Sequence, residues 1–551
     1  MKYYKFIRQC SLVLFLLTFL GLTHAIAQDL NTKISGKIVN ESAEGLIGAS
    51  VAIRNTSTGF YTGTATGVDG TYSVRELPLG GPYTVEITYT GYQPVKQTGI
   101  NLDLGDQLTF DFTLVEGTEL ETVVVTADNL KGRTDRMGSA VAITGKTLST
   151  IPTPTRNFEQ LSSIAPTGYV ADVGSRNFGG AGVGGVKGGQ TGYTVDGGNT
   201  RRMVFGGSLD GPAFTISQEA IREFEISTND YDVKNGRNLG GNISAVTKSG
   251  TNELHGSAWY YRGGGEGPLT QDKSFTGDQL SQTPTQDQYG LSIGGPIIKD
   301  KLFFFGVFDR FKTSPVANPF EVGFLDFNNQ VFGSVADAES FYGMTESEAQ
   351  AILDAGSAKG YDVGELGPLL RSVQTQNIFF KLDYNINDKH RASLRYSWLD
   401  YFQTNDNSSN NAHGFANVIP NSGNLYGTNA SNYLFETTDT KIIGSLRSQF
   451  TNKILNNFKL QFVNTLRSNA PNDAEQETRV FVGASNGAIA FGQNTWVPEV
   501  VESQSIQIID DVTIDAGAVT YTFGMNHQFY NQSERLPHYT APSVIYDNVE
   551  D

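Results

Sequence analysis

The chain has 551 residues, a length that predicts two or three structural units rather than one small domain. Only 38% of the residues are hydrophobic and 62 are glycine, which is low for one large apolar core and fits a chain of alternating strands. The formal net charge is −17 and no dense run of lysine or arginine follows Arg8, which argues against a nucleic-acid-binding protein.

Residues 1–27 have the pattern of a secretory signal peptide. Lys2, Lys5 and Arg8 form a basic start, and Ser11 to Leu22 is an apolar run too short to span a bilayer comfortably. The small-x-small pattern at Ala25 to Ala27 is typical of a signal peptidase site. The alternative is a short membrane anchor. The residues predicted at the cleavage site are Ala25, Ala27 and Gln28.

Export would leave the mature chain without cysteine, because the single cysteine, Cys10, lies inside this segment. A disulfide framework and a cysteine-based metal site are therefore not expected. No other segment reaches about 18 consecutive apolar residues, so helical membrane spans are not expected either.

Residues 30–116 predict a small β-sandwich. Apolar and polar residues alternate in 33–39, 49–53 and 83–87, and turn residues such as Asp69-Gly70 and Thr90-Gly91 separate the runs. Short strands at such close spacing favour a sandwich over other all-β folds.

This segment resembles the carboxypeptidase regulatory-like domain found at the front of many outer-membrane receptors of the Bacteroidetes. The resemblance implies a carbohydrate-binding-like fold in which Tyr72 packs inward. Sugar binding does not follow from it, because no cluster of exposed aromatic residues stands out. The matching segments are Gly36 to Val39, Leu46 to Val51, Asp69 to Tyr72 and Tyr89 to Tyr92.

Residues 119–127 form a short Val/Thr run preceded by acidic residues. Such a β-prone peptide can add itself as a strand to the edge of a partner's sheet. The run resembles a TonB box, which implies that it binds the energising protein TonB in the periplasm. The alternatives are a closing strand of the preceding sandwich or a simple linker. The residues predicted for this box are Glu121, Thr122, Val123, Val124, Val125, Thr126 and Ala127.

Residues 130–253 are rich in glycine and small polar residues and predict an α+β unit. A short helix is expected at Asn157 to Ile164, a glycine loop at Gly179 to Gln190, and a strand that ends in a turn at Thr191 to Asn199. A helix followed by a strand is expected at Ser217 to Ile226.

The order of these pieces resembles the plug domain of TonB-dependent receptors, most closely the Oar-like branch. The most specific motif is Thr247 to Asn252 followed by His255 to Ser257. The resemblance covers nearly all of the chain after the signal peptide.

Residues 254–551 repeat a period-two alternation that predicts an antiparallel transmembrane β-barrel. In Arg391 to Trp398, one face carries alanine, leucine, tyrosine and tryptophan and the other carries arginine and serine. The links between strands are alternately long and short, roughly 25, 5, 66, 4, 40, 6, 37 and 2 residues, as in barrels with long extracellular loops and short periplasmic turns. The expected strands lie near 254–262, 287–295, 301–310, 377–386, 391–400, 441–451, 458–467, 505–515 and 518–530.

The longest link is expected to hold a helix, because Thr345 to Glu348 forms a capping box ahead of Ala349 to Leu353. The predicted strands are too few to close the barrel, since plugged transporters use about 22. The chain also ends at Asp551 without the terminal aromatic residue of family members. We therefore expect an N-terminal fragment with an incomplete barrel.

Enzyme motifs do not stand out. No histidine begins a zinc-peptidase pattern, and no Gly-x-Ser-x-Gly elbow occurs. Gly180, Gly182 and Gly185 match a dinucleotide-binding string, but neither a buried strand nor an amphipathic helix is expected around it, so a plug loop is favoured. We expect no enzyme, no metal and no cofactor.

The sequence thus predicts a mainly β protein in the outer membrane of a Gram-negative bacterium, with the front domain and plug on the periplasmic side. The resemblance implies a receptor that imports a surface ligand with energy relayed by TonB and its inner-membrane complex. Expected partners are TonB, outer-membrane lipid and a surface lipoprotein; the ligand is unknown, with a glycan, a peptide or a siderophore equally compatible. The alternatives are an Oar-like surface adhesin or secretion-linked barrel, and a surface enzyme.

Overall fold

A computed structural model describes the chain in segments. These are residues 32–117, 123–126, 140–148, 151, 162–165, 167–171, 180–186, 191–200, 216–228, 236, 238–264, 285–314, 316–317, 335–364, 369–370, 373–405, 425–428, 433–471, 479–484, 486–492, 498–516, 519–535 and 543–546. The predicted signal peptide with Ala25, Ala27 and Gln28, and most of the predicted helix at Asn157 to Ile164, lie outside them. Within these segments, no helix has the length and apolar character needed to cross a membrane.

The front of the chain folds into two facing sheets, as the alternating pattern predicts. In the first sheet the central strand β1 pairs with β4, β7 and β8; in the second the order is β3-β2-β5-β6-β9. The strands of the first sheet are β1 (Lys33–Asn40), β4 (Thr71–Arg75), β7 (Gln107–Thr109) and β8 (Phe112–Leu114). Those of the second are β2 (Ser50–Asn55), β3 (Tyr61–Ala65), β5 (Gly80–Thr88), β6 (Val95–Leu102) and β9 (Val123–Thr126).

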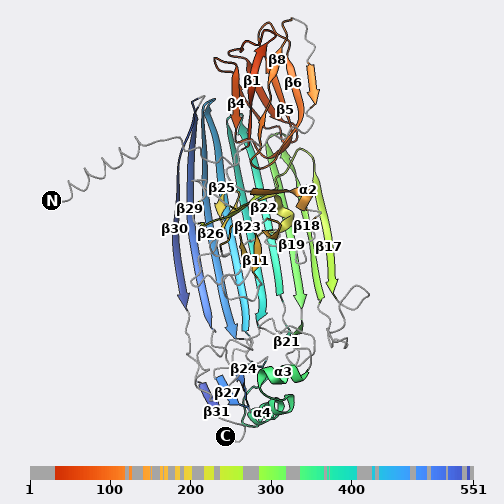
Figure 1. Ribbon diagram of the computed structural model, residues 1–551, viewed down its shortest axis with the longest axis vertical. Coiled ribbons are helices and arrows are strands. Elements are labelled where there is room, and N and C mark those ends of the chain that lie inside the picture. The colour runs from red at the N-terminus through yellow and green to blue at the C-terminus, as the bar shows by residue number, and fades with distance from the viewer. Residues whose placement is uncertain are drawn as a thin grey trace, which may run out of the picture.

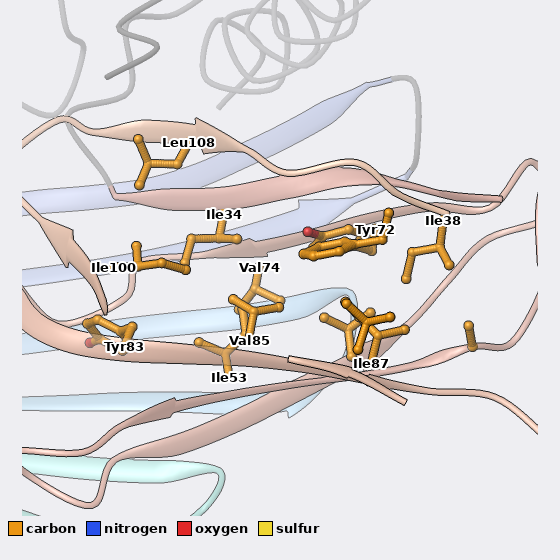
Figure 2. Packing of buried hydrophobic residues seen from close by; sticks show 14 of the residues in the cluster. Ile34, Ile38, Ile53, Tyr72, Val74, Tyr83, Val85, Ile87, Ile100 and Leu108 are labelled. Carbon is orange, nitrogen blue, oxygen red and sulfur yellow. The ribbon is translucent and has the colours of Figure 1, made fainter. Parts of the chain in front are cut away.

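The core of this sandwich lies between the two sheets (Figure 2). Alternate residues of each strand point into it, as Ile34 and Ile38 do from β1 and Val85 and Ile87 from β5. Tyr72 also packs inward, and its hydroxyl donates a hydrogen bond to the carbonyl oxygen of Phe110 at 2.9 Å. Burial of each large apolar side chain contributes about 1.5–3 kcal/mol to the stability of the sandwich.

The second unit is a small sheet, called here the plug, with the strand order β10-β15-β16-β13-β14. The predicted strand and turn at Thr191 to Asn199 is a β-hairpin, and the predicted helix and strand at Ser217 to Ile226 is a 3-10 turn followed by a strand. Its elements are β10 (Ala140–Thr144), α2 (Gly145–Leu148), β13 (Gly192–Val195), β14 (Gly198–Asn199), η4 (Gln218–Ala220), β15 (Ile221–Ser227) and β16 (Asn242–Thr247).

Part of the glycine-rich segment forms a strand rather than a loop. Gly180–Gly182 is strand β12, which pairs antiparallel with β11 (Tyr169–Ala171). A Cβ atom on Gly182 would lie 2.2 Å from the ring of Tyr169, so this glycine permits a close approach of side chain to backbone.

The third unit is a nine-stranded sheet in which each strand pairs with the next along the chain, all antiparallel. One strand lies at each of the nine predicted places. The strands are β17 (His255–Gly264), β18 (Thr285–Ile298), β19 (Leu302–Ser314), β22 (Val373–Asn387), β23 (His390–Asn405), β25 (Tyr433–Thr451), β26 (Ile454–Pro471), β29 (Glu499–Asp515) and β30 (Thr520–Arg535).

Most of these strands are longer than expected. The alternation predicts about ten residues each, whereas β25 has 19 and β26 has 18. The backbone ladder between them continues through residues such as Thr437 and Arg467, where the alternation of apolar and polar residues is no longer visible. Main-chain hydrogen bonds do not depend on side-chain polarity, which explains why the pattern underestimates the length.

The two faces of the sheet have the polarity expected of a membrane barrel. Leu394 and Phe380 are 49% and 42% exposed, whereas Arg395 and Ser397 on the opposite face are each 1% exposed. The exposed face is therefore apolar and the covered face mostly polar, apart from residues such as Phe305 and Phe379 that meet the second unit of the chain. This is the reverse of a water-soluble sheet and the arrangement that a lipid exterior and a filled interior require.

At the end of the strands opposite the front sandwich, pieces of several long links fold together (Figure 1). We call this unit the cap. Thr345 caps the N-terminus of its longer helix, as predicted, by accepting a hydrogen bond from Glu348 N. The cap consists of α3 (Val335–Tyr342), α4 (Glu346–Ala358) and a sheet of order β24-β28-β27-β31, formed by Leu425–Gly427, Ala488–Gly492, Arg479–Gly483 and Ser543–Tyr546. A further short pair is β20 (Val316–Ala317) with β21 (Leu369–Leu370).

Candidate functional site

The tip of the plug hairpin β13–β14 is the centre of a charged cluster inside the sheet wall. Asp196 and Gly197 form the turn, both with positive φ (51° and 80°), which is the conformation that a tight Asp-Gly hairpin turn requires. The Asp196 carboxylate accepts hydrogen bonds from the Thr247 amide at 2.9 Å and from its hydroxyl at 2.8 Å. It also pairs with the Arg395 guanidinium of β23 at 2.8 Å. We call Asp196, Thr247 and Arg395 the plug latch.

Polar side chains of neighbouring wall strands surround the latch. They come from β22, β25, β26 and β29, so the hairpin contacts four consecutive strands, β23, β25, β26 and β29, and Thr247 contacts β22. Lys381 Nζ donates to Thr247 Oγ1 at 3.0 Å, Lys459 Nζ to the Asp196 carbonyl at 3.0 Å, Lys441 Nζ to the Thr200 carbonyl at 3.5 Å, Gln461 Nε2 to the Asn199 carbonyl at 2.7 Å, and Asn199 N to Gln507 Oε1 at 3.0 Å.

These surroundings keep Asp196 ionised. Burial by itself would raise the pKa of its carboxyl group, but Lys381 and Arg395, with the two hydrogen bonds from Thr247, outweigh burial and hold the pKa well below its usual range. The hairpin tip therefore carries a negative charge that the basic wall compensates.

A second contact fixes the other side of the plug. Ser217 Oγ donates to Asp309 Oδ2 of β19 at 2.6 Å, and Gln288 Nε2 of β18 donates to the same carboxylate. Apolar packing accompanies it, because the plug core is continuous with Phe305, Val307 and Phe379 of the wall.

The Thr247 to Asn252 motif forms the corner at which the plug passes into the first wall strand. A Cβ atom on Gly250 would lie 2.3 Å from the Phe304 carbonyl oxygen, so only glycine allows this approach. Asn252 and Asp300 exchange two hydrogen bonds at 2.7 and 2.8 Å, which joins the corner to the short turn between β18 and β19. The motif is thus explained by close packing of the plug base against the wall.

The middle of the predicted TonB box is part of the front sandwich. Val123–Thr126 forms β9 and pairs in parallel with β6, in the register Val95 with Val123 through Thr98 with Thr126. This is the arrangement of the closing-strand alternative. In the sheet order β9 is the terminal strand, so within the described residues its outer edge has no strand partner. Glu121, Thr122 and Ala127 lie outside the described residues.

The front sandwich sits on the short-turn end of the wall through polar contacts (Figure 1). Arg75 Nη2 donates to Thr520 Oγ1 at 2.8 Å, and Thr62 Oγ1 donates to Gln449 Oε1 at 2.9 Å. Asn385 Nδ2 donates to the Thr58 carbonyl at 3.0 Å. We call this joint the rim contact.

One loop of the sandwich also reaches the plug. Leu104 N donates to Glu223 Oε2 of β15 at 2.5 Å, and Arg222 Nε lies 3.6 Å from Glu223 Oε1. Burial raises the pKa of Glu223 to about 7, and the nearby Asp103 and Asp106 act in the same direction against Arg222 and the Leu104 amide. Glu223 therefore titrates near neutral pH.

Within the described residues no group of three or more histidine, cysteine, aspartate or glutamate side chains has the spacing to hold a metal ion. The charged clusters found here bind parts of the chain to one another. The sequence contained all the latch residues, but their pairing joins positions 199 apart; the only local signals were an Asp-Gly turn and basic residues at inward strand positions.

Comparisons with known proteins agree with this architecture. The carboxypeptidase regulatory-like domain family matches residues 33–115, and the outer membrane beta barrel domain family matches residues 246–325. The TonB-dependent transporter Oar of Myxococcus xanthus is 29% identical over 385 residues, which cover 66% of this chain and 32% of Oar.

The solved structures that match part of this chain include a receptor and a transporter. The ferric enterobactin receptor PfeA of Pseudomonas aeruginosa has 14% identity and a TM-score of 0.46 over 72% of this chain and 49% of its own. The transporter YddB of Escherichia coli has 10% identity and a TM-score of 0.46 over 72% and 48%.

The chain thus spans about a third of the length of the curated relative and about half of each of these solved structures. The two matched domain families, the likeness to Oar and the polarity of the nine-stranded wall all agree. The chain is therefore similar to the TonB-dependent transporter Oar, carries a carboxypeptidase regulatory-like domain at its front, and is a protein of the Gram-negative outer membrane.

Proposed function

We propose that this chain imports a ligand across the outer membrane with energy that TonB delivers through residues 121–127. The observation that carries the proposal is the plug latch, in which Asp196 of the hairpin tip pairs with the buried guanidinium of Arg395 in the wall. A plug held in this way resists displacement from the wall at rest, so energy supplied from elsewhere would drive its rearrangement.

The positions of the parts at the two ends of the wall set the order of the steps. The short turns, the front sandwich and the box strand lie at one end, which we assign to the periplasm, and the cap lies at the other, which we assign to the cell surface. Ligand binds at the surface end, TonB engages the box at the periplasmic end, and the pull disrupts the contacts of the plug. None of these steps requires a bond to be made or broken in the ligand.

Surface adhesion is the second candidate function, and the cap is the observation that favours it. Three links between wall strands and the segment after β30 contribute to one small folded unit with its own apolar core, so the surface end presents a shaped domain rather than independent loops. Such a unit could bind another surface as well as a nutrient.

Deletion of residues 121–127 from the intact gene product separates the two functions. Cells are grown on glycans, peptides or iron-loaded siderophores as limiting nutrients, and their attachment to surfaces is measured in parallel. Import through the box predicts loss of growth on one nutrient class with unchanged attachment. Adhesion would be favoured if the strain without residues 121–127 grows unchanged on every nutrient class and a second strain without the cap loses attachment.

A matched control separates loss of the box sequence from a change in chain length. Replacement of residues 121–127 by a Gly/Ser segment of equal length preserves the spacing to the plug, and the amount of protein in outer-membrane fractions must equal that of the parent. A surface lipoprotein encoded beside this chain, if it copurifies with it, would narrow the ligand to a glycan or a peptide.

A further inference from the structure

We propose that the front sandwich is a lid that TonB lifts from the rim before the plug moves, because the box strand is built into the sheet of that sandwich. This inference rests on the proposed function and specifies which part of the chain receives the pull. TonB would contribute a strand to the outer edge of β9 while the inner edge of β9 stays paired with β6.

The sheet order leaves room for that strand. The order β3-β2-β5-β6-β9 ends at the box, and four consecutive residues of β9 are in register with β6. An extended partner strand would therefore become the sixth strand of an existing sheet. A pull on it would pass through the β6–β9 ladder into the whole sandwich.

The sandwich is also built to move as one body. Its core consists only of its own residues, between Ile34 and Leu114. The plug differs, because its apolar core continues into Phe305, Val307 and Phe379 of the wall. Among the described residues, lifting the sandwich separates no shared apolar core, whereas moving the plug does.

The rim contact has the character of a joint that opens. It contains hydrogen bonds and ion pairs between polar groups, such as Arg75 with Asp515 at 3.7 Å and Thr62 with Gln449 at 2.9 Å. The guanidinium of Arg447, 5.8 Å from the ring centre of Phe60, adds a cation–π contact. Polar interfaces of this kind are typical of domains that separate reversibly, because water can replace the lost partners.

Within the part of the chain that the structure describes, the lid touches the plug beside Glu223 and Arg222. Leu104 of the sandwich donates its amide to Glu223 of β15, and a Cβ atom on Gly80 would lie 1.9 Å from the Arg222 guanidinium, so backbone and plug touch closely there. Lifting the lid removes this contact from β15. The order of events is therefore lid first, then plug.

A reversible tether tests the lid. The chain has a single cysteine, Cys10 in the predicted signal peptide, so new pairs can be labelled selectively. Thr58→Cys and Asn385→Cys place one thiol on the sandwich and one on the rim, at positions that already touch. A short bis-methanethiosulfonate reagent then joins them in intact cells, and each single-cysteine variant treated in the same way is the control.

The tethered protein is expected to lose at least tenfold in import rate and to recover after reduction, with surface binding of ligand unchanged. Import at the control rate in the tethered protein would overturn the proposal. This outcome is distinct from failure of the proposed function, in which deletion of residues 121–127 would itself leave import unchanged.

Hydrogen exchange tests the shared sheet. With the periplasmic domain of TonB bound to the full chain, amides of β9 should gain protection and amides of β6 should keep theirs. Loss of protection in β6 on TonB binding would mean that the box leaves the sandwich, and the lid would then not be pulled through this ladder.

Discussion

The substitution Asp196→Asn tests the plug latch directly. It preserves the shape of the side chain and one acceptor for Thr247, but it removes the charge that compensates Arg395, which is 1% exposed, and Lys381, which is 8% exposed. Removing one partner of a buried ion pair typically costs about 3–5 kcal/mol, because the other charge stays buried without compensation. At the lower figure the population of released hairpin rises by a factor of about 160.

Hydrogen exchange of the purified protein measures this release. The reporter amides are Asp196 N, bonded to the Ala245 carbonyl at 2.9 Å, and Thr200 N, bonded to the Tyr193 carbonyl at 3.0 Å. Both should exchange on the order of 100 times faster in the variant. Asp354→Asn, which removes the same charge from the exposed surface of α4, should leave both rates unchanged.

A double-mutant cycle identifies the partner. Adding Arg395→Met to Asp196→Asn removes the uncompensated guanidinium and should recover part of the lost protection. A solvent-exposed ion pair contributes about 0.5 kcal/mol. If Asp196→Asn changes the free energy of hairpin release by less than this, the latch does not stabilise the position of the plug, and the explanation is refuted.

Three further predictions concern other parts of the chain. The pKa of Glu223 is raised from 4.5 to about 7 in the folded protein, so its contribution to docking of the sandwich is full below about pH 4.5 and is lost as the pH rises through about 7. The substitution Glu223→Gln should abolish this pH dependence. Hydrogen exchange at Leu104 N between pH 5 and pH 8 measures it. Phe491→Ala should cost the cap about 3–5 kcal/mol and raise protease cleavage in the cap without affecting the wall, because Phe491 lies in the cap core; equal loss of wall protection would contradict a separate cap. Gly250→Ala should lower the yield of assembled protein, since its Cβ would lie 2.3 Å from the Phe304 carbonyl oxygen, whereas Gly444→Ala, with no atom within 4 Å, should not; equal yields would refute the packing explanation of the motif.

Much of the fold could be predicted from local patterns. All nine wall strands lie where the alternation places them, because period two is the direct consequence of strand geometry, and most of them, though not β19, expose large apolar side chains. The hairpin at Asp196-Gly197 and the cap helix that begins after Thr345 also follow from short-range chemistry. These features depend on neighbours in the sequence.

Features that depend on distant residues could not be predicted. The Asp196–Arg395 pair and the Tyr361–Tyr546 contact of the cap join segments that are far apart in the sequence. No local pattern in either segment identifies the residue that it contacts. The same applies to Thr62 and Gln449 at the rim contact. The run at 123–126 was compatible with a partner-binding box and with a sandwich strand, since a β-prone peptide with a free edge serves for both.

The measurement that bears most directly on the central claim is ligand uptake resolved into surface binding and internal accumulation. Once the nutrient class is known, a labelled ligand is offered to cells that carry either the intact gene or the form without residues 121–127. Energised import through the box predicts equal surface binding and a loss of internal accumulation in the deleted form. Equal accumulation in both strains would contradict it.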